Sequence, residues 1–193
     1  MKKNYFYYLF KYNFYKILLI SIYAIPLIFL MRLIKPFLFV KLIHIRADRI
    51  GHFVVDGAIA VIKSNDKKNF NIHYFSKKIS NNQWAKMLRR HLHVNNLFRD
   101  VAYINSLIPF GNQHNDNAVE NGSRDINGLF FSTQYAKLKF TKHETKKCLN
   151  WLSKKGIKKS DKFICIIIRD SEYLSINNKD NVDFSYHDFR NSE

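Results

Sequence analysis

The pattern of apolar and polar positions divides the chain into an apolar N-terminal stretch and a region in which strands alternate with helices. Residues 37–45 and 71–75 are mostly apolar, β-branched or aromatic, as buried parallel strands are. Helix-like stretches at 53–62 and up to residue 91 follow these two strands. Such alternation predicts an α/β fold, with a Rossmann-like, mainly parallel sheet and flanking helices.

The pattern continues less regularly after residue 100. Residues 101–104 are a candidate third strand, and residues 111–128, which are rich in Asn, Gly, Asp and Ser, are expected to form a loop. The sequence of residues 141–144 fits a capping box, so a helix is expected to begin there and to end at Gly156. A further buried strand is predicted at residues 163–168.

The N-terminal stretch is uncharged from residue 17 to residue 31 and follows a segment rich in Tyr, Phe and Lys. A straight span needs about 20 residues, which this run approaches if Lys16 and Arg32 extend to the membrane surface. A signal peptide and a soluble core helix are the alternatives, but no small-residue cleavage site follows. Since aromatic and basic flanks are typical of a membrane–water interface, residues 1–36 are predicted to be a membrane anchor, spanning or dipping into one leaflet.

Charge supports a membrane more than a nucleic acid as the partner. The net charge is +17, and residues 1–49 hold nine basic residues and one acid, Asp48. Such an excess attracts phosphates, anionic lipids or nucleic acid, although a composition biased toward Lys, Asn and Ile would also produce it. Because the basic residues surround the most apolar stretch, we expect membrane lipid as a partner and no nucleic acid. Basic residues on both sides of that stretch fit a shallow placement on the cytoplasmic face.

The loop between the first strand and the first helix is the first candidate site. Gly51 would let a ligand approach the backbone, and Arg49 beside a helix N-terminus would attract an anion. His52 could act as a general base near neutral pH. The alternative is an ordinary turn with His52 bonded to the backbone. A single glycine is not a dinucleotide-binding fingerprint.

A second candidate site follows the predicted strand at 163–168, since ligands bind at the carboxyl ends of strands in open α/β sheets. Arg169 can hold a phosphate or carboxylate through two parallel hydrogen bonds, and Asp170 could orient it or accept a proton from a substrate hydroxyl. A salt-bridged strand terminus is the alternative. The polar side chains that could join this site are Tyr173, His187, Arg190 and Asn191.

Three segments together resemble a family of bacterial glycosyltransferases from surface-polysaccharide gene clusters. They are residues 49–53, residues 140–141 with 156–157, and residues 168–173 followed by 186–192. The resemblance covers about residues 27–193. It implies a two-domain, GT-B-like architecture, with residues 37–175 as the N-terminal, acceptor-side domain and residues 176–193 as the interdomain linker. Members of the family continue further, so the chain is expected to be an N-terminal half that is incomplete alone.

The resemblance also implies an activity. A sugar would pass from a nucleotide sugar, which is a co-substrate, to a cell-surface glycan acceptor at the inner membrane, without a metal or other cofactor. The residue roles are our own expectation and are not implied by the resemblance. We expect His52 to be the general base, and Arg169 and Arg190 to neutralise the leaving diphosphate or to hold an anionic acceptor, with Asp170 positioning one of them. A separate C-terminal domain or polypeptide would bind the donor. The alternative is a non-catalytic, basic, membrane-bound protein that binds an anionic polymer or a partner subunit.

Overall fold

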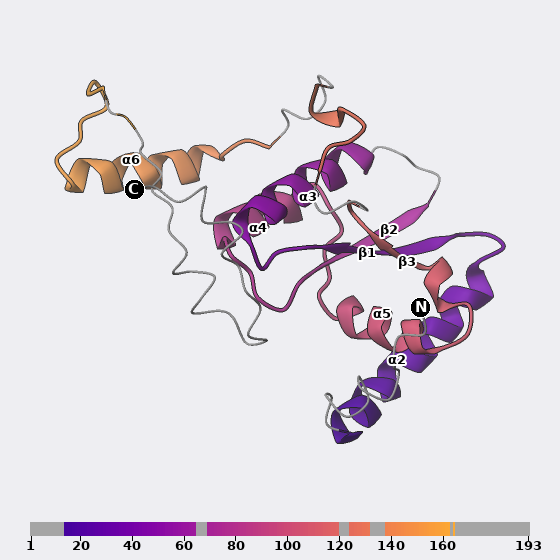
Figure 1. The fold of residues 1–193 in the computed structure, drawn as a ribbon. Coiled ribbons are helices and arrows are strands. Elements are labelled where there is room, and N and C mark those ends of the chain that lie inside the picture. The colour runs from indigo at the N-terminus through magenta and orange to yellow at the C-terminus, as the bar shows by residue number, and fades with distance from the viewer. Residues whose placement is uncertain (1–13, 65–68, 120–123, 132–137, 163, 165–193) are drawn as a thin grey trace, which may run out of the picture. The chain divides into compact units, whose positions relative to one another are not determined.

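The computed structural model in Figure 1 describes residues 14–64, 69–119, 124–131, 138–162 and 164. The chain divides into two compact units, Met1–Phe140 and Thr141–Glu193, which are described separately. The domain boundaries predicted at residues 36 and 175 stay predictions.

The first unit is built on a three-stranded parallel sheet with the strand order β2-β1-β3. The strands are β1 (Val40–Ile45), β2 (Phe70–Phe75) and β3 (Asn115–Asn117). The chain places β2 on one side of β1 and then β3 on the other, so the strand order reverses between β1 and β3. The predicted α/β fold with a Rossmann-like parallel sheet is confirmed.

Helices cover both faces of this sheet (Figure 1). One face carries α3 (Ile50–Lys63) and α4 (Asn82–Arg89), and the other carries α2 (Phe14–Ile34) and α5 (Phe98–Leu107). Because side chains alternate along a strand, each face has its own apolar core. The first two predicted strands correspond to β1 and β2, and the first two predicted helices correspond to α3 and α4.

The core beneath α3 and α4 is centred on two fully buried aromatic rings. Phe53 and Phe75 meet edge to face, with their ring centroids 5.2 Å apart. The Trp84 indole N–H donates to the Phe53 carbonyl at 3.0 Å and ties α4 to α3. A side chain at Gly57 would place its Cβ 2.6 Å from the Leu88 side chain. The absence of a side chain at Gly57 therefore allows α4 to pack closely against α3.

The core on the opposite face includes one side of α2. Four α2 side chains are buried there, namely Ile20, Ala24, Ile28 and Met31. The Tyr23 hydroxyl donates to Asp100 Oδ2 of α5 at 3.0 Å, and Arg32 Nη2 donates to the Pro109 carbonyl at 2.9 Å. Residues Tyr15–Ile34 are also long and apolar enough to cross a membrane. The N-terminal apolar helix is thus a packed part of the first unit as well as a candidate membrane element.

Two predictions after residue 100 are wrong. Residues 101–104 lie inside α5 instead of forming a strand. One face of this helix is buried and includes Val101, Ala102 and Asn105. The prediction failed because a short apolar run is compatible with both a helix and a strand. The predicted loop at 111–128 contains the 3₁₀ turn η1 (Gly111–Gln113) and β3, which is the actual third strand.

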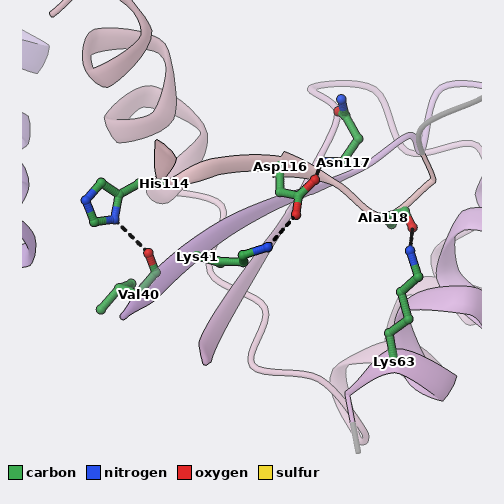
Figure 2. Close-up of polar contacts among 7 residues, drawn as sticks. All are labelled: Val40, Lys41, Lys63, His114, Asp116, Asn117 and Ala118. Atoms are coloured by element: carbon green, nitrogen blue, oxygen red, sulfur yellow. Dashed lines mark hydrogen bonds and ion pairs between the residues drawn. The ribbon is translucent and has the colours of Figure 1, made fainter. Parts of the chain in front are cut away.

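Polar contacts fix β3, whose Asn-Asp-Asn sequence has a low intrinsic preference for strands. Figure 2 shows Lys41 Nζ of β1 at 3.0 Å from Asp116 Oδ2. In the same view Lys63 Nζ of α3 donates to the Ala118 carbonyl at 3.2 Å. The imidazole Nδ1 of His114, just before β3, lies 2.8 Å from the carbonyl oxygen of the first residue of β1. Contacts with β1 and α3 therefore hold in place a strand that propensity alone would not form.

The helix α6 (Lys142–Lys154) of the second unit confirms the predicted capping box. The Glu144 backbone N–H donates to Thr141 Oγ1 at 3.2 Å, and the Thr141 N–H donates to Glu144 Oε2 at 2.8 Å. Gly156 follows the helix with a φ of 85°, the left-handed conformation expected of a terminating glycine. Apart from Ile164, the strand predicted at 163–168 lies outside the described residues.

Candidate functional site

Polar and ionisable side chains gather where β1 ends and α3 begins. The strand order reverses beside this point, and open α/β sheets bind ligands at such a crevice. The predicted site residues Arg49, Gly51 and His52 all lie here. The remaining predicted site residues lie outside the described residues, and their place in this site stays a prediction: Arg169, Asp170, Tyr173, His187, Arg190 and Asn191.

The loop between β1 and α3 is held through its backbone. The Arg46 N–H donates to Asp56 Oδ2 of α3 at 3.2 Å, and the Ala47 N–H donates to Ser76 Oγ, just after β2, at 3.1 Å. Arg46 Nε also lies 3.8 Å from Asp48 Oδ1. Contacts from two neighbouring elements therefore fix the path of this loop, which is what a binding site needs of its scaffold.

His52 lies in the first turn of α3 and is partly buried. Burial holds the pKa of its imidazole below the usual value, and the nearby Arg46 guanidinium lowers it further. The negative charge of Asp56 acts in the opposite direction. Because the net effect lowers the pKa, the ring is neutral at pH 7, and a neutral imidazole is the form that accepts a proton.

Asp56 is a residue of this region that the sequence analysis missed. It lies four residues after His52 on α3, so the two side chains share one face of the helix. Its side chain is 5% exposed, and Oδ1 has no hydrogen-bond partner among the described residues. Its other oxygen, Oδ2, accepts from the Arg46 N–H, so Asp56 holds the loop and also leaves one costly buried oxygen unpaired. The signal in the sequence was a single acid inside an otherwise apolar helix.

His44 was also missed, because it lies within a strand that reads as apolar. In the sheet it stands opposite Tyr74 of β2 and Asn117 of β3. Its Nε2 lies 3.0 Å from Ser76 Oγ, and its ring stacks on Tyr74 with the centroids 5.3 Å apart. Burial lowers the pKa of His44, although a hydrogen bond with the Asn117 side chain opposes that shift. A second neutral imidazole thus borders the carboxyl end of β1.

The start of α3 can receive an anion. Arg49 is the residue before the helix, with no side-chain hydrogen bond capping the helix, and the first turn contains no acid. The first N–H groups of a helix have no partner within it, and the helix dipole favours negative charge there. Gly51 is exposed, and a Cβ added to it would meet no atom within 4 Å. The fold itself does not require a glycine at this position.

A separate cavity of about 330 Å³ lies at the amino end of β2, between the end of α3 and residues 91–93. Three of the residues that line it are histidines: His73, His91 and His93. His73 is 2% exposed, and burial lowers its pKa to about 4. In the part of the chain that the structure describes, no group of three His, Cys, Asp or Glu side chains could hold a metal ion.

His73 should make the stability of the protein depend on pH. The folded pKa of about 4 lies below the ordinary value of 6.5. Between these two values the unfolded chain takes up a proton that the folded chain does not, so stability falls as the pH falls. We expect the free energy of unfolding to drop by about 2 kcal/mol from this residue between pH 7.5 and pH 5.

Urea unfolding of the full chain in a mild detergent, followed by circular dichroism at both pH values, measures this effect. The variant His73→Gln removes the titrating group, so the difference between the two pH values should shrink by that amount. An unchanged pH dependence in the variant would contradict this role of His73.

No protein family, curated protein or solved structure matches this chain. The glycosyltransferase resemblance of the sequence therefore remains a prediction.

Proposed function

We propose that the first unit is the acceptor-side domain of a membrane-associated glycosyltransferase at the cytoplasmic face of the inner membrane. The enzyme moves a sugar from a nucleotide sugar to a cell-surface glycan acceptor. The observation that carries this proposal is the partly buried, neutral imidazole of His52 beside Arg46, Arg49 and Asp56, where the strand order reverses. This arrangement combines a base with positive charge at the usual ligand crevice of an α/β sheet.

In the proposed reaction the His52 imidazole accepts the proton of an acceptor hydroxyl. The hydroxyl oxygen forms a bond to the anomeric carbon of the donor sugar, and the bond from that carbon to the diphosphate oxygen breaks. The nucleoside diphosphate leaves with the electron pair, and positive side chains stabilise its charge. Arg46 and Arg49 contribute to that charge, together with the predicted residues Arg169 and Arg190. Asp56 holds the Arg46 backbone, and its negative charge makes His52 more basic by raising the pKa of the imidazole.

A nucleotide-sugar-binding domain is the proposed partner, carried by this polypeptide or by another. The first unit of this chain supplies the acceptor side. The test therefore contains both this chain and the nucleotide-sugar-binding domain. Membranes containing the chain and that domain are incubated with a panel of radiolabelled nucleotide sugars. We expect release of nucleoside diphosphate and incorporation of the labelled sugar into a membrane-bound glycan.

The rival function is non-catalytic binding of an anionic polymer or a partner subunit, which the net charge of +17 favours. Two results together would replace the proposed function with this one. The membrane experiment would detect neither sugar transfer nor nucleotide-sugar binding, and the chain would retain an anionic polysaccharide in a salt-sensitive way.

A further inference from the structure

The side of α2 that faces away from α5 is apolar and exposed to solvent. We call it the outer face of α2, and its residues are between 52% and 69% exposed: Leu18, Leu19, Ile22, Ile25, Phe29 and Leu33. The opposite side of the helix is equally apolar but buried in the core. A continuous apolar strip of this length on a folded protein marks a contact surface.

Charge identifies the occupant of this surface as an anionic lipid bilayer. Lys16 lies near one end of the strip, Lys35 follows the other end, and no acid occurs before Asp48. Anionic headgroups attract basic residues that flank an inserted apolar face. A second copy of the chain fits less well, because a symmetric pair would bring the same basic residues toward one another.

The inner contacts of α2 are incompatible with a helix that crosses the bilayer. Tyr23 lies near the middle of the apolar stretch Tyr15–Ile34, and its hydroxyl is bonded to the Asp100 carboxylate. In a spanning helix that carboxylate would enter the hydrocarbon, where ionisable groups are costly. The other possibility is separation of α2 from α5, which would expose Leu42 and Val101, both fully buried against it. Lying flat on the membrane avoids both costs.

We propose that α2 lies in the plane of an anionic membrane, with its outer face inserted into one leaflet and its inner face kept in the protein core. This inference rests on the membrane association in the proposed function and defines its geometry. Tyr23 contacts the start of α5, and Arg32 contacts the Pro109 carbonyl beyond its end, so α2 and α5 run in the same direction. The sheet then lies above this helical layer, and its carboxyl edge opens sideways along the membrane surface.

The first test compares two equally exposed isoleucines. Ile22 is 69% exposed on the outer face, and Ile126 is 65% exposed in the segment next to α3. Full-length wild type, Ile22→Asp and Ile126→Asp are sedimented with vesicles of phosphatidylglycerol and phosphatidylcholine. We expect Ile22→Asp to weaken binding at least tenfold and Ile126→Asp to leave it unchanged. Equal binding by all three proteins, or equal losses in both variants, would overturn the proposal.

The second test reports the geometry and does not depend on the folding of Ile22→Asp. Lys16→Cys and Lys35→Cys are made in a chain that also carries Cys148→Ser and Cys165→Ser, and each is labelled in sealed membrane vesicles with an impermeant maleimide. In-plane binding predicts that both ends of α2 react from the same side. If the two ends of α2 reacted from opposite sides of the membrane, the helix would span the bilayer and the proposal would be wrong.

Failure of this inference can be distinguished from failure of the proposed function. Neither vesicle assay contains a nucleotide sugar, so a lack of sugar transfer leaves both results unchanged. A chain that stays off anionic vesicles and forms a soluble dimer, in which Ile22→Asp restores the monomer, would assign the outer face to a second copy instead.

Discussion

Replacing His52 by alanine is expected to lower the turnover number for sugar transfer by about 10²–10⁴-fold, the usual contribution of a positioned acid or base. The alanine side chain cannot accept the proton of the acceptor hydroxyl. His52 is only partly buried, so its loss should leave the fold intact. Initial rates are measured in the membrane assay with the donor-binding domain present, and circular dichroism checks the fold. The matched control is His91→Ala, which removes an exposed histidine of the same unit outside this site.

The variant Asp56→Asn separates a catalytic role of His52 from a structural one. The charge of Asp56 raises the pKa of His52, so its removal should lower that pKa further. The acidic limb of the pH–rate profile reports the protonation of the base and should therefore move to lower pH. Full turnover in His52→Ala would refute the general-base assignment, and an unshifted profile in Asp56→Asn would remove Asp56 from the site.

Replacing Gly111 by alanine is expected to destabilise the first unit by about 3 kcal/mol or more. A Cβ at this position would lie 1.6 Å from the Asn105 carbonyl oxygen, so the turn would have to move away from α5. That movement would break the 2.8 Å hydrogen bond from Asn105 Nδ2 to the Gly111 carbonyl. It would also disturb the bond from Asn105 to Asn115, at the start of β3. The midpoint of thermal unfolding should fall by roughly 10 °C.

Gly51→Ala is the matched control for that experiment, because its added methyl group meets no atom within 4 Å. We expect a change in stability of about 0.5 kcal/mol or less, since alanine suits a helix at least as well as glycine. Equal destabilisation by both substitutions would contradict the close approach of Gly111 to α5. A loss of sugar transfer in Gly51→Ala at normal stability would instead support the approach of a ligand at Gly51.

Segments with a local physical signal could be predicted from the sequence. The Thr141 capping box and the terminating Gly156 depend on residues within one or two helical turns, so α6 was placed correctly. The strand β1 has buried residues on both faces, and β1 and β2 both carry a strong composition signal. His52 was found for a similar reason, since it follows such a strand at a helix start.

Features that depend on contacts between distant residues could not be predicted. Contacts with β1 and α3 hold β3 in place, and one of them joins Asp116 to Lys41, 75 positions earlier in the chain. The helix α5 was misread because a short apolar run of residues does not reveal its period. Asp56 and His44 join the candidate site only because the sheet and α3 bring them beside the loop that follows β1. The sequence of a single segment does not show which distant residues it contacts in the fold.

The packing of α2 has a practical consequence for producing the protein. Hydrophobic N-terminal segments are commonly deleted to obtain a soluble fragment, and residues 1–36 look suited to such a deletion. The deleted residues would include Ile20, Ala24, Ile28 and Met31, which complete one of the two cores. The shortened chain would present the bare face of α5 and of the sheet to water, and aggregation would follow. Solubilisation therefore has to shield the outer face of α2, with detergent or nanodiscs, and leave the helix in place.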